Sequence, residues 1–318
     1  MKTEYTVSPS DATVRLDRFL RQQAPQHSRA YLQQLIDREL VTVNGASKKA
    51  RYPVKAGERI QVDFPDIQPF PTAAAMPLDI IYEDNDLLAI NKPVGMTVHP
   101  NSTEDQGTLV QALLAHAPEI VNAVYDPESA ISRMRPGIVH RLDKDTGGVI
   151  LAAKTREALL NLAKQFHDHT VQKCYLALVH GEITEDQTIH TVIARKHTGD
   201  GRMGARPLSN PGREAITHIH PVRTIRYGRD VATVIECRIE TGRTHQIRVH
   251  CKYIGHPVIG DPLYTNKPAS ALSKRLNVTH QLLHASRITF RHPKSGREIS
   301  LESRGFEHGI PFDNHPAT

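Results

Sequence analysis

The sequence has no tryptophan, three cysteines and few aromatic residues of any kind, which make up 5% of its 318 residues. With so few aromatic rings, stacking on a long run of nucleic-acid bases is not the expected way of binding. The cysteines, Cys174, Cys237 and Cys251, lie far apart and form no CxxC pair. Their spacing argues against a disulfide framework or a structural zinc site and favours a reducing, cytoplasmic environment.

Long apolar runs are also missing, although hydrophobic residues, at 39%, suffice for a packed core. No stretch approaches the roughly 20 apolar residues that a membrane-spanning helix needs. The first 13 residues contain no apolar run, so we expect neither a secretory signal nor a membrane partner. At about 100–200 residues per domain, the length predicts two domains or one large domain with an appendage.

Positive charge is concentrated at the start of the chain. The first 64 residues contain eleven Lys or Arg and seven Asp or Glu, so +4 of the net charge of +6 lies there. An excess of cations favours a polyanionic partner without establishing one, because many basic proteins bind no nucleic acid.

Residues 13–64 predict a small α/β unit. Apolar residues at helical spacing in 16–20 indicate one short helix, and Ser28 can cap a second helix with its apolar face in 31–36. The run VTVNG at 41–45 predicts a strand and a turn, and residues 60–64 alternate as a closing strand does.

The order of these elements resembles the S4 RNA-binding module. The resemblance implies that the second helix and the basic loop after it follow an RNA backbone, because Lys and Arg neutralise phosphates. A solvated basic surface without a ligand is the alternative. The cations that we expect to contact RNA here are Arg29, Lys48, Lys49 and Arg51.

Residues 65–77 are rich in Pro and Ala and predict a linker to a larger domain at 78–302, followed by a tail at 303–318. Strand-like and helix-like segments alternate irregularly in the larger domain, and strands fall in hairpin pairs, as at 78–93 and 282–302. The pattern predicts an α+β fold with a mixed, mostly antiparallel sheet flanked by helices, and not a doubly wound parallel sheet.

Other segments of this domain have clear local patterns. Thr108 can cap a helix, and residues 156–168 form an amphipathic helical pattern. Strands are expected at 148–155, 174–183 and 232–241.

Several common catalytic signatures are absent or unconvincing. GxxxxGK[ST], HExxH and GxSxG do not occur. Residues 199–204 (GDGRMG) match GxGxxG by letter, but their polar, basic neighbours indicate a flexible loop and no dinucleotide site. The 19 histidines include the pairs His167/His169 and His218/His220, yet no Cys or acid with ligand spacing stands near, so we expect no metal site.

The stretch PGIVHRLDKDTGGVILAAKT, residues 136–155, places a charged loop directly before an apolar strand. A rigid scaffold exposes reactive groups at such places. Asp143 has cations close in sequence, Arg141 and Lys144, which favour its ionised form, and an ionised carboxylate can act as a nucleophile or a base. An ordinary turn with a local salt bridge is the other interpretation of this loop taken alone.

HRLDKDTGG resembles the HRLD-x-x-T-S-G signature of the RluA-type pseudouridine synthases, with Gly147 where that family usually has Ser or Thr. We expect this departure to alter loop hydrogen bonding and to leave the chemistry unchanged. Residues 86–100, 173–181 and 240–264 resemble three further family segments in the right order. With the S4-like module in front, the chain is most similar to the D-type synthases of large-subunit ribosomal RNA.

The resemblance implies a reaction and a catalytic set. Enzymes of this family detach a uracil from its ribose, rotate it and rejoin it through C5, without a cofactor or metal. Asp143 would be the essential catalytic residue, Tyr175 the active-site tyrosine and Arg248 the partner of the Asp143 carboxylate. The alternatives are a core tyrosine at 175 and a solvated helix arginine at 248, with Arg243 as a competing candidate. Thr244 can cap the helix that carries Arg248, with Gly255 ending it.

Further residues would contact RNA. The resemblance implies that Arg141 helps to displace the target base, since extruding a base costs a few kcal/mol; an arginine that braces the loop is the alternative. Residues 195–214 resemble the RNA-gripping loop of the family, and a surface insertion is the alternative. The expected RNA contacts of this domain are Arg141, His140, Lys92, Arg243, Arg195 and Arg202.

The sequence therefore predicts an RNA pseudouridine synthase that modifies uridines of large-subunit ribosomal RNA, as a cytoplasmic monomer without a small-molecule cofactor. Two alternatives stay open: a non-catalytic RNA-binding or ribosome-assembly protein on the same scaffold, and the same reaction on transfer RNA. The joint presence of Asp143, Tyr175 and Arg248 favours an enzyme, because a scaffold freed from catalysis need not keep all three.

Overall fold

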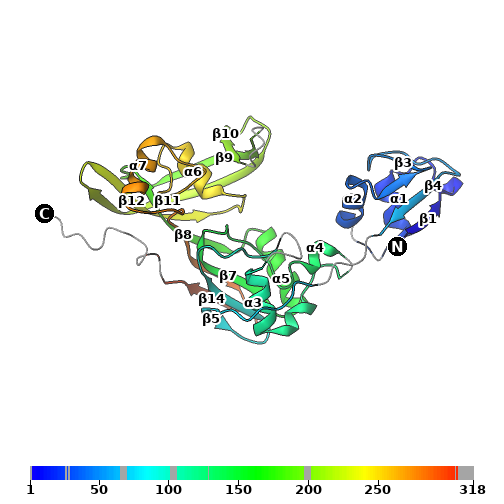
Figure 1. The fold of residues 1–318 in the computed structure, drawn as a ribbon, viewed down its shortest axis with the longest axis horizontal. Helices are drawn as coiled ribbons and strands as arrows, with labels where there is room; N and C mark the ends of the chain where they lie inside the picture. The colour runs from blue at the N-terminus through cyan, green and yellow to red at the C-terminus, as the bar shows by residue number, and fades with distance from the viewer. Residues whose placement is uncertain are drawn as a thin grey trace. The chain divides into compact units, whose positions relative to one another are not determined.

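The computed structural model of the chain describes residues 2–25, 27, 29–64, 70–100, 106–127, 129–196, 202–304 and 306. Among these residues, no helix combines the length and the apolar character that a membrane span requires. The chain forms two compact units, drawn in Figure 1. The first contains Met1–Thr72, Pro100–Asp105 and Val124–Pro136, and the second contains Ala73–His99, Gln106–Ala123 and Gly137–Thr318.

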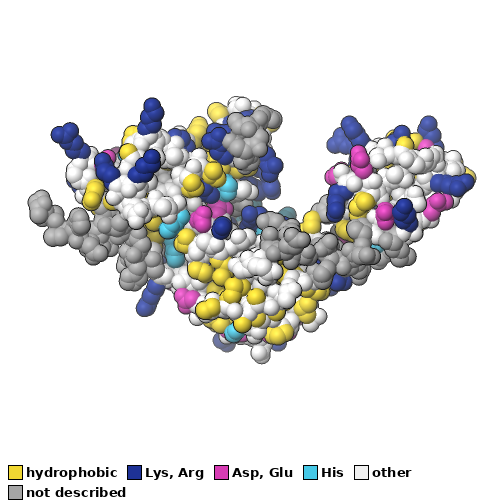
Figure 2. All heavy atoms as spheres, viewed as in Figure 1, with side chains coloured by type: hydrophobic (Ala, Val, Ile, Leu, Met, Phe, Trp, Pro, Cys, Tyr) yellow, Lys and Arg dark blue, Asp and Glu magenta, His cyan; other side chains and the backbone are white. Residues whose placement is uncertain are grey.

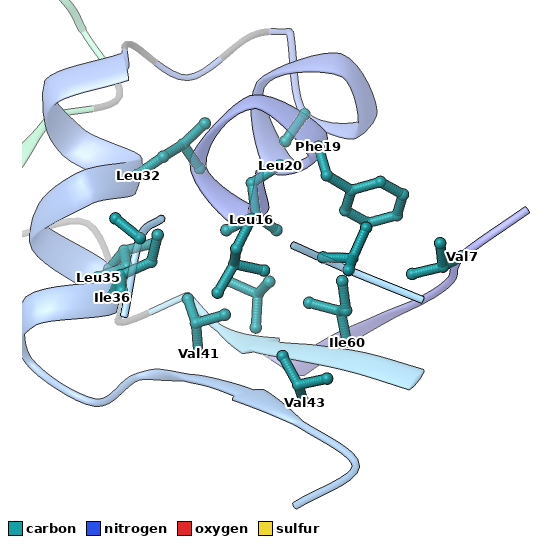
Figure 3. Packing of buried hydrophobic residues seen from close by; sticks show 14 of the residues in the cluster. Val7, Leu16, Phe19, Leu20, Leu32, Leu35, Ile36, Val41, Val43 and Ile60 are labelled. Carbon is teal, nitrogen blue, oxygen red and sulfur yellow. The ribbon is translucent and has the colours of Figure 1, made fainter. Parts of the chain in front are cut away.

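A four-stranded antiparallel sheet and two helices make up most of the first unit. Leu16, Phe19 and Leu20 are fully buried and pack in one cluster with Val41 and Ile60 (Figure 3), which confirms the predicted helical stripe. The elements of this unit are β1 (Lys2–Thr6), η1 (Pro9–Asp11), α1 (Leu16–Gln23), α2 (Arg29–Asp37), β2 (Val41–Val43), β3 (Ala46–Ser47), β4 (Arg59–Asp63) and α4 (Ala130–Arg133). The strand order is β1-β4-β2-β3.

The turn between β2 and β3 is as the sequence predicts. Asn44 and Gly45 have φ angles of 50° and 80°, values that suit a tight hairpin turn. The strand β1 was not predicted, because its residues alternate between exposed and half-buried and include no apolar run. Ser28, the expected cap of the second helix, lies outside the described residues.

A ten-stranded sheet forms the body of the second unit. Its strands are β5 (Ile80–Glu83), β6 (Leu87–Lys92), β7 (Gly147–Ala153), β8 (Gln172–His180), β9 (Gln187–Arg195), β10 (Met203–Arg206), β11 (Arg213–Tyr227), β12 (Asp230–Ile239), β13 (Leu283–Arg291) and β14 (Glu298–Glu302). The order is β10-β9-β11-β12-β8-β13-β7-β6-β5, with β14 paired to β13. All pairs are antiparallel except β13 with β7.

Helices cover both faces of this sheet. They are α3 (Leu109–His116), η2 (Pro118–Asn122), α5 (Arg156–His167), α6 (Gln246–Tyr253) and α7 (Lys267–Arg275). Leu88 and Ile90 of β6 pack with α3, whereas Leu87 and Ala89 pack with α5, because successive side chains of a strand point to opposite faces. In the same way, α6 and α7 pack on opposite faces of β8 and β12.

The observed architecture confirms the predicted α+β fold with a mixed, mostly antiparallel sheet. The hairpin β5–β6, the strands β7, β8 and β12, the helix α5 and the hairpin β13–β14 all lie where the sequence places them. Thr108 precedes α3 as predicted, and its backbone N–H donates to the side-chain oxygen of Gln111 at 3.1 Å. The three cysteines are buried free thiols.

The region around the glycine-rich segment is more ordered than the sequence indicates. Residues 195–214 were expected to form a loop, but Arg195 ends β9, residues 203–206 form β10 and Arg213 begins β11. Of the GDGRMG segment, residues 199–201 lie outside the described part of the chain, and its last two residues belong to β10. The long strand β11 was missed because its buried positions are Ala215, Thr217 and Ile219, so small and polar residues weaken the apolar alternation.

The start of β7 approaches β13 so closely that glycine is required. Gly148 has a φ of 108°, and a Cβ built there would lie 2.2 Å from the carbonyl oxygen of Ala285. Ala285 pairs with Gly148 on one side and with Tyr175 of β8 on the other. The charged loop before β7 is thereby brought next to Tyr175. Gly147 is also tightly packed, since a Cβ there would lie 3.2 Å from Nδ1 of His284.

We predict that Gly148→Ala lowers the free energy of unfolding by about 3–5 kcal/mol, because positive-φ strain adds to a backbone clash. The matched control is Gly296→Ala, at a φ of 69° with no atom within 4 Å of the added Cβ. It should cost only about 1–2 kcal/mol. Urea denaturation followed by circular dichroism measures both, and equal losses in the two variants would contradict the close approach of β7 and β13.

Candidate active site

Asp143 and Arg248 meet in an ion pair, as the sequence predicts, although 105 positions separate them. Nη1 of Arg248 donates to Oδ2 of Asp143 at 2.8 Å. The Asp143 side chain is 20% exposed and that of Arg248 is 5% exposed. The pair therefore sits at the boundary between the protein interior and solvent, with the carboxylate on the outer side.

A second carboxylate, Asp261, holds the inner side of the Arg248 guanidinium. Nε and Nη2 of Arg248 donate to the two oxygens of Asp261 at 2.7 and 3.0 Å, and the Asp261 side chain is 0% exposed. Oδ1 of Asp261 also accepts the backbone N–H groups of Leu263 and Tyr264. Burial lowers the pKa of Arg248, but the two carboxylates outweigh it and raise that pKa above its usual value. Asp261 thus fixes the direction in which Arg248 points.

The helix that carries Arg248 does not begin as predicted. Thr244 is not its cap: α6 starts at Gln246 after His245, whose φ is 57°. Gln246 instead organises the entry to the helix, because its side-chain oxygen accepts from the Thr241 hydroxyl at 2.7 Å and from the Arg243 backbone N–H at 3.0 Å. The predicted end is confirmed, with Gly255 at a φ of 88° just beyond the helix.

Tyr175 extends from β8 into the same cavity as the ion pair. The cavity has a volume of about 120 Å³, with Asp143 and Arg248 among its lining residues and Ile239 and Leu283 as apolar wall. Burial, with a smaller contribution from the Asp143 charge, raises the pKa of Tyr175 far above its usual value. The phenol therefore keeps its proton at neutral pH. Its hydroxyl makes no hydrogen bond to another residue in the described part of the chain.

His245 borders the carboxylate from the other direction, and sequence reasoning did not single it out. Its Nδ1 lies 2.8 Å from the hydroxyl of Tyr264, which also accepts the backbone N–H of Met203 at 2.9 Å. Nε2 of His245 is 3.8 Å from Oδ1 of Asp143, which is too long for a hydrogen bond. Burial lowers the pKa of His245 against the opposing charge of Asp143, so the ring is neutral at pH 7.

Arg141 and Arg243 line the cavity as well. Arg141 is exposed and makes no hydrogen bond or ion pair with any residue that the structure describes. Arg243 is half-buried, and its Nε donates to the carbonyl oxygen of Glu214 at 2.9 Å. Arg195 is exposed at the end of β9, and Arg202 is half-buried just before β10. The structure thus brings Arg141 and Arg243 to the ion pair.

Lys92 is buried, contrary to a surface role in an RNA groove. Its Nζ donates to the backbone carbonyls of Pro93, Met96 and Lys144 at 2.8, 2.9 and 3.0 Å. Burial lowers the pKa of Lys92 to about 8, against the charges of Asp145 and Asp143. Its three donors hold the loop beside Asp143, and contact with RNA would require this packing to open.

His140 also braces the loop from within. Its Nε2 accepts the backbone N–H of Leu151 at 2.9 Å, and its ring stacks on Phe166 with 4.5 Å between centroids. Burial lowers the pKa of His140 to about 3, so the ring is neutral and offers no positive charge to a phosphate.

The basic residues expected to bind RNA in the first unit are exposed. Arg29 lies 3.3 Å from the buried carboxylate of Asp17. Lys48 lies over the ring of Tyr52, 5.4 Å from its centroid. Figure 2 shows Lys and Arg side chains projecting from this unit. All four expected cations, Arg29, Lys48, Lys49 and Arg51, are open to solvent.

Among the described residues, one group has the spacing of a metal site, and it includes neither HxH pair. Its members are Asp84, Asp86 and His292, whose potential ligand atoms lie within 4.8 Å of one another. Asp84 already accepts from the backbone of Asp86 and Leu87 and bonds to Tyr82 and His292. These contacts describe a hydrogen-bonded turn, because the carboxylate oxygens are occupied by protein donors.

The geometry can now be compared with known proteins. The sequence model of the RNA pseudouridylate synthases matches residues 86–253, more than half of the chain. The chain belongs to this family. It is an RNA pseudouridine synthase, an isomerase, which removes the non-catalytic alternative. The sequence model of the S4 domain matches residues 14–60, so the synthase carries an S4 domain in its first unit.

Several relatives cover nearly the whole synthase. An uncharacterized RNA pseudouridine synthase of Synechocystis is 42% identical over 90% of this chain and 84% of that protein. The ribosomal large subunit pseudouridine synthase D of Nitrosomonas europaea is 39% identical over 94% and 83% of the two chains. The structure of human RNA pseudouridylate synthase domain containing 1 aligns with a TM-score of 0.57 at 26% identity, covering 73% of this chain and 85% of that one.

We predict that Asp261→Asn lowers the rate of pseudouridine formation about a hundredfold, because an amide N–H facing Nε of Arg248 displaces the guanidinium, and small misplacements are costly in catalysis. The matched control is Asp186→Asn, whose side chain is exposed and bonds only to His220 among the described residues. Single-turnover assays on RNA from cells lacking the enzyme measure both. Equal activity of the two variants would contradict the positioning role of Asp261.

The synthase should lose stability in acid through His250 of α6. Its ring is fully buried between the hydroxyls of Thr191 and Thr217, and burial lowers its pKa to about 4. The unfolded chain takes up this proton below about pH 6.5, so stability falls by up to about 1.4 kcal/mol per pH unit between roughly pH 6.5 and 4. His250→Gln should show a shallower decline in urea denaturation. An unchanged slope would contradict the assignment.

Proposed function

We propose that this synthase isomerises specific uridines of large-subunit ribosomal RNA, with Asp143 as the essential catalytic residue. One observation carries the catalytic assignment. Arg248 donates to Oδ2 of Asp143, while Oδ1 has no hydrogen-bond partner among the described residues, and the Asp143 side chain lines the cavity. A negatively charged oxygen in that position is available to the ribose or the ring of a bound uridine.

Tyr175 and Arg248 complete the proposed catalytic set. The phenol of Tyr175 lies in the same cavity as Asp143, keeps its proton and has a hydroxyl free of described partners. It can pack against a uracil ring and move a proton at the sugar or at C5. Arg248 orients the carboxylate and balances its charge. The reaction keeps all atoms of the uridine, so it requires neither a redox partner nor an activated donor.

RNA contact is proposed for the cations around this set. Arg141 is exposed at the cavity and unpaired among the described residues, which suits a side chain that replaces an extruded base. Arg243, Arg195 and Arg202 would contact the backbone from the second unit. In the S4 domain, the exposed cations Arg29, Lys48, Lys49 and Arg51 would do the same.

The choice of ribosomal RNA rests on the relatives. Several proteins 36–39% identical to this chain over most of its length have the name ribosomal large subunit pseudouridine synthase D. We further propose domains at 13–64 and 78–302, a linker at 65–77 and a tail at 303–318. The enzyme would act in the cytoplasm as a monomer, without a small-molecule cofactor.

We predict that Asp143→Asn abolishes pseudouridine formation, with a loss of at least about a thousandfold, because the isosteric amide cannot supply the anionic oxygen. RNA binding should stay within about threefold of wild type. Asp145→Asn, two residues along the same loop, is the control and should keep most of the activity. The measurement maps pseudouridines in ribosomal and transfer RNA from cells without the gene, complemented by each variant.

Pseudouridines restored in ribosomal RNA by the wild-type and Asp145→Asn proteins, and not by Asp143→Asn, are the expected result. Activity of the Asp143→Asn protein would overturn the catalytic assignment. Restoration in transfer RNA alone would overturn the substrate and leave the catalytic residue in place.

A further inference from the structure

A second pocket adjoins the cavity around Asp143. It shares Arg141, Tyr175 and Arg243 with that cavity and extends to Lys173 on β8 and Arg213 on β11. Its volume is about 480 Å³, and its lining contains four Lys or Arg and three His but no Asp or Glu. A pocket with this composition is suited to an anion.

Lys173 is the most deeply placed of these cations. It is 9% exposed, and its Nζ makes one hydrogen bond among the described residues, a long one of 3.5 Å to the carbonyl oxygen of Glu240. Burial and the positive charge of Arg243 lower the pKa of Lys173. An ammonium taken out of water is costly unless an opposite charge compensates it. No carboxylate in the described residues forms an ion pair with Lys173.

The acids nearest in sequence to Arg213 and Arg243, Glu214 and Glu240, bond to other residues. Glu214 bonds to His190 at 2.7 Å, and Glu240 bonds to His218 at 2.8 Å. Arg213 and Glu214 are successive residues of β11, so their side chains point to opposite faces of the sheet. Glu214 therefore leaves Arg213 without a counter-ion in the pocket.

Arg243 completes the group of cations. Its Nε is anchored on the carbonyl oxygen of Glu214 at 2.9 Å, which leaves its terminal donors unused among the described residues. Burial and the neighbouring charge of Arg213 lower its pKa, against the opposing charge of Glu214. Three cations at one pocket thus repel one another until an anion is bound.

We propose that Lys173, Arg213 and Arg243 form a subsite for one backbone phosphate of the RNA, beside the pocket of the target uridine. The subsite rests on the proposal that the uridine reacts at Asp143, because the wall that the two pockets share contains Tyr175 and Arg141. A phosphate held there would fix the register of the strand, so that one nucleotide reaches Asp143. Lys173 is new as an RNA contact. Arg213 lies in the segment 195–214 that resembles an RNA-gripping loop, and the subsite gives Arg213 and Arg243 a defined ligand, one phosphate.

The test measures how binding to a transcript of large-subunit ribosomal RNA depends on KCl between about 50 and 200 mM. Each lost phosphate contact should reduce the slope of log K against log [KCl] by about 0.7–0.9. Lys173→Met keeps the apolar stem and removes the charge. Arg213 is exposed, so Arg213→Gln should leave the fold intact. Lys294→Met, an exposed lysine between β13 and β14, is the control and should keep the wild-type slope.

Both single variants should bind more weakly than wild type at low salt and lose about one unit of slope. Because the two cations share one phosphate, the double variant should also lose about one unit in total. Single variants with the wild-type slope and affinity would overturn the subsite, and a double variant that loses about two units would overturn the shared phosphate.

Failure of the proposed function is separable from failure of the subsite. Pseudouridine mapping tests whether Asp143 acts on ribosomal RNA, whereas the salt slope reports phosphate contact whether or not the uridine reacts. Thermal unfolding of each variant distinguishes the loss of a phosphate contact from the loss of the fold.

Discussion

The buried guanidinium of Arg248 is the interaction on which the rest of the site depends. It joins two carboxylates, one fully buried and one at the cavity, and it uses Nε and both terminal nitrogens for them. A charge so far from water is stable only with such partners. Breaking the pair on the Asp261 side would leave an uncompensated buried charge and would release Asp143. The stability of this region and the proposed catalysis therefore depend on the same three side chains.

The sheet supplies the rest of the geometry. The loop with Asp143 leads into β7, and Tyr175 lies on β8. The strand β13 lies between β7 and β8, and β7 can approach it closely because Gly148 has no side chain. Lys92 and His140 hold this loop in place. Lys92 donates to three backbone carbonyl oxygens, and His140 accepts a backbone N–H. The carboxylate is therefore held by elements from distant parts of the sequence that converge on one rigid region.

Much of this could be predicted from the sequence, and the gaps have physical causes. The HRLD segment and residues 240–264 resemble motifs of the family, so the resemblance implied the ion pair even across 105 positions. Asp261 was missed because its pairing with Arg248 depends on tertiary packing, and the residues around Asp261 in the sequence show no pattern that indicates it. Lys92 and His140 were expected to face RNA because a sequence displays charge but not burial. Thr244 has a type of side chain that often caps helices, yet the side chain of Gln246 accepts the hydrogen bonds of the loop before α6 instead.

The S4 domain shows the same division. Its helices, its hairpin turn and its core follow directly from apolar spacing and from Asn44-Gly45. The strand β1 contributes little apolar surface and gains its place only by pairing with β4, a long-range contact that composition does not reveal. In this domain, the helices with a buried apolar face were predictable, and the strand held mainly by backbone pairing was not.

The most direct test of the central claim is a crystal structure of the Asp143→Asn protein bound to an RNA that contains an intact target uridine. Our account predicts that the uridine is turned into the cavity, with its ribose C1′ or its ring within about 3–3.5 Å of the side chain at 143 and its base against Tyr175. A uridine bound elsewhere, with the side chain at 143 remote from the sugar and the ring, would contradict it.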